Sequence, residues 1–327
     1  MTDSVLGIDI AKKKFDVALL QDGNYKMATF TNDRRGFTKL VRWLKNGHVG
    51  QLHACLEATG SYGEALALFL HETGFCVSNV NPSRIKAYAE SQLRRNKTDR
   101  EDAKVIAHFC LTQQPSHWTP PPPAQRELRS MSRHLNALKK MRTQELNRLK
   151  SGANSTIVHS ALEEHIAFLD AQIQQLADQI QEHISNRDML KKERKLIQSI
   201  PGFGRLSAAK LLAEVPDLTA FASAAQLAAY AGLTPRQKES GSSIHKRARL
   251  SKTGNTHIRA ILYFPAMVAI RHNPIVRALA ERLEARGKSP MTIIGAAMRK
   301  LLFLAFGVVK TDKPFDPNHH VNILRTT

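Results

Sequence analysis

The stretch Val5-Leu-Gly-Ile-Asp9-Ile-Ala-Lys-Lys-Lys14-Phe-Asp-Val-Ala-Leu-Leu20-Gln-Asp-Gly-Asn-Tyr-Lys-Met27-Ala-Thr-Phe-Thr31 decides the fold class. Three short runs in it, Val5–Asp9, Phe15–Leu20 and Met27–Thr31, have the composition of β-strands. Turn-forming residues at 12–14 and 22–24 separate these runs. The stretch therefore predicts a three-stranded meander.

The segments that follow alternate between helix and strand patterns. We expect helices at 36–45 and 62–72, strands at 52–58 and 76–81, and further helices from Pro82 and from Thr98. The order βββαβαβα is typical of a mixed sheet covered by helices. Residues 1–114 are thus predicted to be an α/β domain.

A proline-rich stretch at 115–123 predicts a stiff, extended linker, since consecutive prolines forbid helix. Residues 124–190 then predict a coiled-coil helical hairpin with its turn at 151–154. The second helix carries an apolar stripe with heptad spacing, made of Leu162, Ile166, Leu169, Ile173, Leu176 and Ile180. This stripe could pair with the preceding helix or with another subunit.

Residues 191–327 predict a mainly α-helical C-terminal domain. It opens with Pro201-Gly-Phe-Gly204 between two helical segments, a helix-hairpin-helix-like pattern whose free amides can hold a phosphate. A plain helix corner is the alternative. Helices are expected near 223–231, 255–271, 274–286 and 290–308, with a basic Gly/Ser loop between the first two.

Charge indicates the class of partner. The 327 residues have a net charge of +20, and the segment 191–327 alone has 23 basic and 8 acidic residues, a net +15. Such a charge favours nucleic acid. The apolar runs 260–270 and 301–309 are shorter than the roughly 18 residues of a membrane span, so no membrane association is expected. Three scattered cysteines and the lack of a signal peptide pattern predict buried, reduced thiols in a bacterial cytoplasm.

Four acids of the first domain can be considered together. Asp9 lies in the first strand, Glu57 at the end of a later strand, and Asp99 and Asp102 share one helix face. The negative charge of clustered carboxylates must be balanced by positive charge, and carboxylate oxygens favour Mg²⁺ or Mn²⁺ as the bound cation. Two Mg²⁺ ions could stabilise both the attacking and the leaving oxygen of a phosphodiester. Each acid alone also has a structural explanation, as a helix-start, surface or strand-end residue.

These motifs bring a family into view. The segments Gly7-Ile-Asp9-Ile-Ala-Lys, Leu56-Glu57-Ala-Thr-Gly60-Ser-Tyr62, Arg95-Asn-Lys97-Thr-Asp99-Arg-Glu-Asp102 and Gly254-Asn-Thr-His-Ile-Arg259 resemble the DEDD transposases of insertion-sequence family one-ten, which are related to Piv-type DNA invertases. The resemblance covers nearly the whole chain. It implies an RNase H/RuvC-like fold for the first domain and DNA transposase activity.

The loop between Arg236 and Lys252 contains six basic residues and one acid. The chemistry of this loop alone does not show which of Ser240, Ser242, Ser243 and Ser251 would be a nucleophile. The loop could also bind phosphate without containing a nucleophile. The family resemblance implies that Ser240 attacks DNA to form a covalent intermediate. The residues assigned to phosphate contacts are Arg236, Lys238, Lys246, Arg247, Arg249 and Lys252.

The resemblance also implies the partners. These are target and donor DNA, a non-coding bridge RNA that pairs with both, and further copies of the chain in a dimer or tetramer whose composite site combines two subunits. Two alternatives stay open: a metal-dependent junction nuclease without a covalent serine, and a non-catalytic nucleic-acid-binding scaffold.

Overall fold

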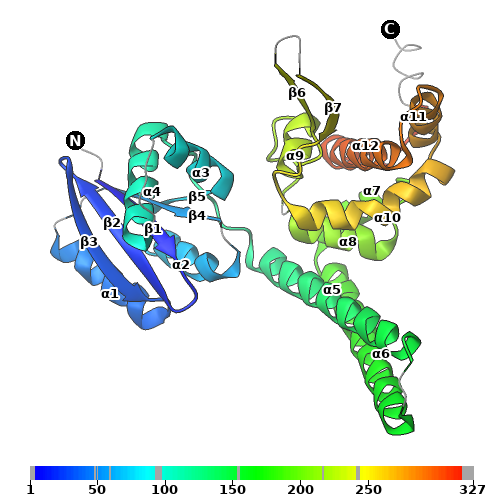
Figure 1. The fold of residues 1–327 in the computed structure, drawn as a ribbon, viewed down its shortest axis with the longest axis horizontal. Helices are drawn as coiled ribbons and strands as arrows, with labels where there is room; N and C mark the ends of the chain where they lie inside the picture. Colours follow the sequence, from blue (N-terminus) through cyan, green and yellow to red (C-terminus); the bar gives the residue numbers. More distant parts are fainter. Residues whose placement is uncertain are drawn as a thin grey trace. The chain divides into compact units, whose positions relative to one another are not determined.

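The structure is a computed structural model of the chain, and it describes residues 4–47, 49, 51–58, 60–92, 98–152, 155–215, 217–240 and 244–318. For Ser61 and for residues 237–240 and 244–249 it describes the backbone alone. The chain forms two compact units, Met1–Pro120 and Pro121–Thr327, drawn in blue to cyan and in green to red in Figure 1.

A five-stranded mixed sheet forms the N-terminal unit. Its strands are β1 (Ser4–Ile10), β2 (Lys14–Gln21), β3 (Asn24–Thr31), β4 (Leu52–Glu57) and β5 (Cys76–Val80), in the order β3-β2-β1-β4-β5. The first three strands are the antiparallel meander expected from the sequence, and β4 pairs in parallel with both β1 and β5. Asp22 and Gly23 have positive φ angles of 50° and 76°, which fit a two-residue type I′ hairpin turn.

Helices cover both faces of this sheet (Figure 1). On one face, α1 (Arg34–Asn46) and α2 (Ser61–Glu72) bury apolar side chains such as Leu40 and Leu66 against β1 and β4. On the other face, α3 (Pro82–Ser91) and α4 (Asp99–Gln113) pack through Ile85 and Ile106. The mixed α/β architecture predicted for this part of the chain is therefore observed.

The proline-rich stretch is not a free connector over its first residues. Trp118 donates its backbone N–H to the Val77 carbonyl at 2.7 Å, and the Ser78 hydroxyl donates to the carbonyls of Pro115 and Ser116. Because Trp118 also packs on the core of the N-terminal unit, residues 115–118 belong to that unit. The expectation of a simple linker is wrong for them.

The C-terminal unit begins with two long helices, α5 (Pro123–Lys150) and α6 (Thr156–Ser185). Arg142 of α5 forms an ion pair with Asp170 of α6. Leu169 and Ile180 of the apolar stripe are buried. The stripe thus faces a helix of the same chain, and its coiled-coil geometry stays a prediction.

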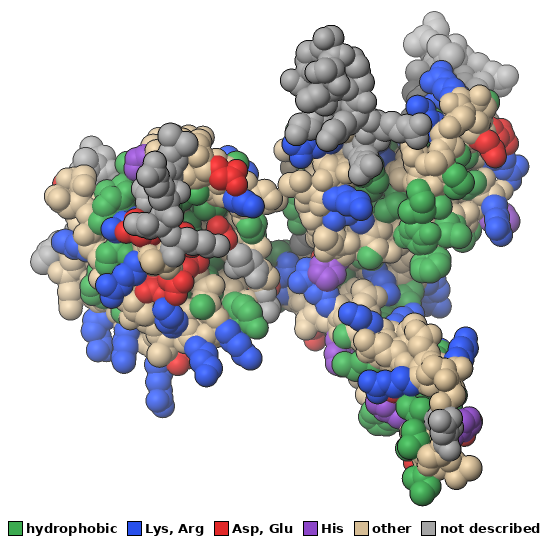
Figure 2. Space-filling view, in the orientation of Figure 1, with side chains coloured by type: hydrophobic (Ala, Val, Ile, Leu, Met, Phe, Trp, Pro, Cys, Tyr) green, Lys and Arg blue, Asp and Glu red, His purple; other side chains and the backbone are tan. Residues whose placement is uncertain are grey.

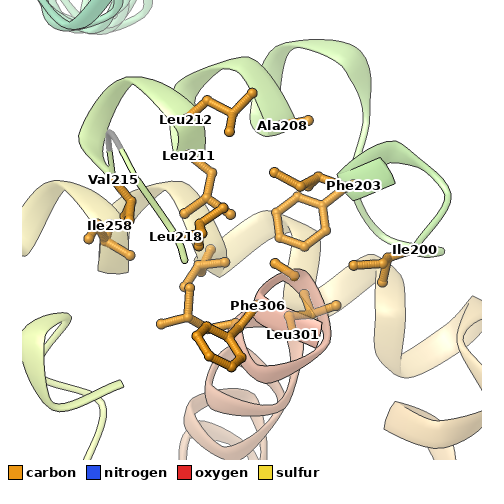
Figure 3. Close-up of a cluster of buried hydrophobic side chains, with 14 of the residues drawn as sticks. Ile200, Phe203, Ala208, Leu211, Leu212, Val215, Leu218, Ile258, Leu301 and Phe306 are labelled. Atoms are coloured by element: carbon orange, nitrogen blue, oxygen red, sulfur yellow. The ribbon is translucent and has the colours of Figure 1, made fainter. Parts of the chain in front are cut away.

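The remaining helices enclose a large apolar core. They are α7 (Asp188–Gln198), α8 (Arg205–Glu214), α9 (Ala224–Tyr230), α10 (Thr256–His272), α11 (Pro274–Ala285) and α12 (Pro290–Thr311). Figure 3 shows side chains from α8, α10 and α12, among them Leu211, Ile258 and Leu301, pointing toward one another. Burial of such side chains is the main driving force for this packing.

The turn at residues 199–204 joins α7 to α8 and packs into this core. Gly202 has a φ of 118°, and a Cβ there would lie 2.8 Å from the Pro265 carbonyl oxygen. The buried Asn273 donates to the Pro201 carbonyl, and the Gly204 amide donates to the Ser207 hydroxyl. The turn acts as a helix corner here, and a phosphate-binding helix-hairpin-helix role stays a prediction.

The basic segment expected as a loop contains a two-stranded antiparallel hairpin. Its strands are β6 (Pro235–Ser240) and β7 (Ile244–Leu250). Their sequences, Pro-Arg-Gln-Lys-Glu-Ser and Ile-His-Lys-Arg-Ala-Arg-Leu, have little of the apolar alternation by which strands are usually detected. The sequence-based expectation of a loop is therefore wrong for this segment.

Two further expectations concern membrane and thiols. Among the described residues one helix, α12, is long and apolar enough to cross a membrane, with a mean hydropathy of 1.8. Half of that stretch is buried within the structure, as in a core helix. Cys55 and Cys110 are buried, whereas Cys76 is exposed, so the expectation of three buried thiols is wrong for Cys76.

Candidate active site

Acidic side chains from neighbouring strands share one face of the N-terminal sheet. Asp9 of β1 pairs directly with Asp16 of β2, and Ile8 pairs with Leu56, so that Glu57 of β4 follows next to Asp9. Because side chains alternate along a strand, all three acids point away from the face that buries Ile8 and Leu56. They lie on the face covered by α4.

Gly7 allows α4 to approach this face closely. A Cβ atom at Gly7 would lie 2.1 Å from the Ala103 carbonyl oxygen and 2.2 Å from the Ala107 nitrogen. No side chain fits between β1 and α4 at this point. The close contact brings the first turn of α4, with Asp99 and Asp102, next to the strand that carries Asp9.

Local capping fixes where α4 begins. Thr98 is the N-cap residue, and its hydroxyl accepts a hydrogen bond from the Glu101 amide at 3.2 Å. Acidic residues in a first turn are stabilised by the helix dipole. The spacing of Asp99 and Asp102 places both on one side of this turn, as the sequence indicates.

The electrostatics of Asp9 show that these acids influence one another. Burial and, in decreasing order, the negative charges of Asp102, Asp99 and Asp16 together raise the pKa of Asp9 to about 6. A neighbouring carboxylate raises a pKa only when it is close enough to repel the charged form. Asp9, Asp16, Asp99 and Asp102 thus form one electrostatic cluster, and Glu57 lies on the adjoining strand.

Lys14 partly compensates this negative charge. Its ammonium group donates to Asp16 Oδ2 at 3.1 Å and to Asp99 Oδ2 at 2.9 Å. These contacts hold the pKa of Asp99 below its usual range and raise that of Lys14. Asp16, only 4% exposed, also accepts a hydrogen bond from the Thr29 hydroxyl at 2.5 Å.

The cluster has the donor set of a hard divalent cation. Carboxylate oxygens are the ligands that Mg²⁺ and Mn²⁺ prefer. Within the described part of the chain, however, no three acidic, histidine or cysteine side chains converge closely enough to hold a metal ion as they stand. Figure 2 shows acidic side chains gathered on one face of the N-terminal unit.

Sequence reasoning missed Asp16 and Lys14. A signal for Asp16 exists, because it is a charged residue within the apolar run of β2, in the same sense that Asp9 is unusual within β1. Its pairing with Asp9 depends on the register between β1 and β2. The role of Lys14 depends on a contact across 85 positions, for which sequence spacing gives no sign.

The serine segment lies in the other unit. Ser240 is the last residue of β6, where its backbone pairs with Ile244. The side chains of Ser240, Lys238, Lys246, Arg247 and Arg249, and all of Ser242 and Ser243, lie outside what the structure describes. Arg236 and Lys252 are exposed near the base of the hairpin.

The base of the hairpin is held by a tightly packed clamp. Arg259 donates to the Ala231 carbonyl at 2.8 Å, and the Ser251 and Lys252 amides donate to the carbonyls of Thr234 and Gly232. A Cβ atom at Gly232 would lie 2.4 Å from Arg259 Nη1.

Glu214 of α8 extends this clamp to other helices. It accepts a hydrogen bond from Asn255, the N-cap residue of α10, at 3.1 Å. It also accepts two from Arg133 of α5 at 2.8 and 2.9 Å. The Gly254–Arg259 motif therefore joins the hairpin to the helical core.

Two protein families match this chain. Residues 6–156 match a family described as transposase, and residues 194–281 match the transposase IS116/IS110/IS902 family. The first match spans nearly all of the α/β unit and the whole of α5, and the second spans α8, α9, the hairpin and α10.

Individual relatives extend the similarity along the chain. A pilin gene-inverting protein of Moraxella bovis is 35% identical over 323 residues, which are 98% of this chain and 100% of that protein. The transposase for insertion sequence element IS1111A of Coxiella burnetii is 25% identical over 295 residues, which are 82% of this chain and 78% of that protein. Among solved structures, T. thermophilus RuvC in complex with a Holliday junction substrate aligns with 35% of this chain and 99% of its own, at a TM-score of 0.28 and 10% identity. At that level the structural likeness carries no functional information.

Proposed function

This chain belongs to the IS110-type family of transposases, and from that premise we propose that it cleaves and rejoins target and donor DNA through a covalent serine–DNA intermediate. Its relatives are named a pilin gene-inverting protein and a transposase, and it is an enzyme that acts on DNA. The carboxylates of the sheet and of α4 are the proposed metal-binding half of its site, and Ser240 is the proposed nucleophile.

The observation that supports the proposal is that Asp9 and Glu57 lie on the face of the sheet that α4 covers, and that the first turn of α4 carries Asp99 and Asp102. Four carboxylates there would hold two Mg²⁺ ions, or Mn²⁺ in their place. Bound ions would supply Lewis-acid stabilisation of oxygens at a phosphodiester. Asp9 must be ionised to serve as a ligand, and its raised pKa of about 6 still leaves it mostly ionised at neutral pH.

The covalent step exchanges one phosphodiester for another. The Ser240 hydroxyl oxygen bonds to phosphorus, the bond from phosphorus to a deoxyribose oxygen breaks, and the proton passes from the serine to the leaving hydroxyl. Attack by a different strand end then reverses the exchange and frees the serine. No phosphodiester energy is lost, so strands are rejoined without an external energy source.

The test is to trap the intermediate. The full chain is incubated with Mg²⁺, with the RNA that copurifies with it and with target and donor DNA, and protein–DNA adducts that survive denaturation are measured. We expect an adduct that Ser240→Ala abolishes, whereas Ser251→Ala, a change in the same basic segment, leaves it intact. Asp9→Asn should also abolish it.

Two other outcomes would replace the proposal. Metal-dependent cleavage without an adduct, unaffected by Ser240→Ala, would indicate a junction nuclease. DNA binding without cleavage in any of these proteins would indicate a non-catalytic scaffold.

The basic C-terminal segment supports the proposed partners. Its net charge of +15 over residues 191–327 suits phosphate backbones, which position nucleic acid without reading its sequence. We assign backbone contacts to Arg236, Lys238, Lys246, Arg247, Arg249 and Lys252. A bridge RNA that pairs with target and donor DNA would supply the sequence specificity, and sequencing the RNA that copurifies with the chain tests this assignment.

We further propose that the site is completed by a dimer or tetramer. The acids and Ser240 lie in different units of the chain, so they can be combined from two subunits. Apolar side chains on the α5–α6 pair remain exposed, among them Ile157 at 80% and Phe168 at 60%. Mixing inactive Asp9→Asn and Ser240→Ala proteins tests this arrangement: adduct formation in the mixture requires a site shared between subunits.

A further inference from the structure

The carboxylate cluster already contains a positively charged group. The Lys14 ammonium lies between Asp16 and Asp99, at 3.1 Å from one carboxylate oxygen and 2.9 Å from the other. Asp16 is almost fully buried and pairs with Asp9 in the sheet register. Lys14 therefore joins the strand side of the cluster to the first turn of α4.

The contact with Asp99 uses an oxygen that the proposed metal site needs. An ammonium group is a donor without a lone pair, so it satisfies carboxylates but cannot act as a metal ligand. A divalent cation close to it would be repelled by its charge. Lys14 and a metal ion therefore compete for Asp99 Oδ2.

We infer that Lys14 is an internal counter-ion that occupies the carboxylate cluster and is exchanged for the divalent cation when the metal site is loaded. The inference rests on the proposed metal site. It adds that Lys14 stabilises the metal-free protein, that it competes with metal binding, and that its ammonium becomes available beside the site once Asp99 is engaged.

Exposure of the side chain makes this exchange feasible. The Lys14 side chain is 49% exposed, while that of Asp16 is 5% exposed. The lysine can thus turn outward without opening the core, and the aspartate cannot. A released ammonium at this position would face solvent, where the phosphate of a DNA strand bound at the cluster could accept its hydrogen bonds.

The experiment is a titration of Mn²⁺ into the metal-free full chain, followed by electron paramagnetic resonance and calorimetry. Lys14→Met removes the charge and keeps the length of the side chain. We expect it to bind Mn²⁺ about two- to five-fold more tightly than the original protein, the range that an exposed ion pair can account for. The same variant should unfold at a lower temperature without metal, and Mn²⁺ should restore most of the difference.

Two control variants separate competition from a general charge effect. Lys104→Met also removes an ammonium at α4, but Lys104 pairs with Glu101 at 2.7 Å, and we expect a nearly unchanged Mn²⁺ affinity. Lys14→Arg keeps the charge and should behave as the original protein does.

Unchanged or weaker Mn²⁺ binding by Lys14→Met would overturn the inference while leaving the metal site in place. Absence of Mn²⁺ binding in the original protein would overturn both the inference and the proposed metal site. An equal gain in affinity for Lys104→Met would show a non-specific charge effect and would also overturn the inference.

Discussion

Asp9 has a pKa raised to about 6 from 3.8 by burial and by the charges of Asp102, Asp99 and Asp16. A carboxyl with a higher pKa in the folded than in the unfolded chain binds more protons when folded. Its ionisation therefore lowers the free energy of unfolding as pH rises from about 3.8 to about 6. This cost is absent below that window and constant above it.

From this sign we predict that Asp9→Asn stabilises the metal-free protein at pH 7 by about 1 kcal/mol, a value reduced for the partial exposure of the group. Urea unfolding in the presence of a chelator measures the effect, which should vanish at pH values well below 3.8, where Asp9 is protonated in both states. Asp22→Asn, in the β2–β3 turn, is the control. A destabilised Asp9→Asn protein at pH 7 would contradict the electrostatic cluster.

Gly7 of β1 lies directly against the backbone of α4. A methyl group at this position meets the backbone of Ala103 and Ala107 at 2.1–2.8 Å, which a side-chain rotation cannot relieve. We predict that Gly7→Ala lowers the free energy of unfolding by about 1–3 kcal/mol, as overpacking does, and weakens Mn²⁺ binding by moving α4 away from β1. Gly307→Ala, in α12, is the control, because a Cβ there meets no atom within 4 Å. Urea unfolding and Mn²⁺ titration provide the readouts, and equal behaviour of the two variants would refute the close approach.

Among the elements, the β6–β7 hairpin depends on contacts outside itself. The Arg259 guanidinium donates a hydrogen bond to the Ala231 carbonyl, and burial lowers the pKa of Arg259. We predict that Arg259→Lys leaves the helices intact but increases hydrogen exchange at the Ser251 and Lys252 amides by about ten-fold, the value of one lost hydrogen bond to a charged group. Exchange measured by mass spectrometry tests this, with Arg271→Lys on the same helix as the control. Unchanged protection in Arg259→Lys would show that the clamp does not hold the hairpin.

The elements also show how far sequence reasoning reaches. The meander of β1 to β3 and the start of α4 at Thr98 follow from turn chemistry, apolar alternation and capping, which are local. The β6–β7 hairpin does not, because its basic strands lack an apolar face and their pairing is supported by α8 and α10. The attachment of residues 115–118 to β5 also depends on contacts between distant residues. The Ser78 hydroxyl of β5 donates hydrogen bonds to the carbonyls of Pro115 and Ser116, and local sequence patterns do not predict such contacts.

In the candidate site, too, some residues follow from local sequence patterns and others depend on tertiary contacts. Asp9, Glu57, Asp99 and Asp102 could be named from strand and helix spacing, because each sits at a recognisable position within its element. Their common face follows once the strand order is known. Lys14 and Asp16 join the cluster through tertiary contacts, which the sequence does not display.

At the scale of the whole molecule, charge is unevenly distributed, with a net +15 in residues 191–327. We predict that DNA binding weakens steeply with salt, and that replacing both Arg236 and Lys252 with Gln lowers the slope of log K against log salt by about 2. Fluorescence anisotropy at several salt concentrations measures the slope. The matched change of Arg34 and Arg42 in α1 should leave it nearly unchanged, and an equal loss in both proteins would argue against binding at the hairpin base.

The proposed function depends most on a metal site formed by carboxylates from β1, β4 and α4. Anomalous diffraction at the manganese edge, from crystals of the full chain grown with Mn²⁺, tests this most directly. We predict peaks about 2.2 Å from carboxylate oxygens of Asp9 and Glu57, with Asp99 turned from Lys14 toward the metal. Manganese bound elsewhere, with Asp99 still paired to Lys14, would contradict the account.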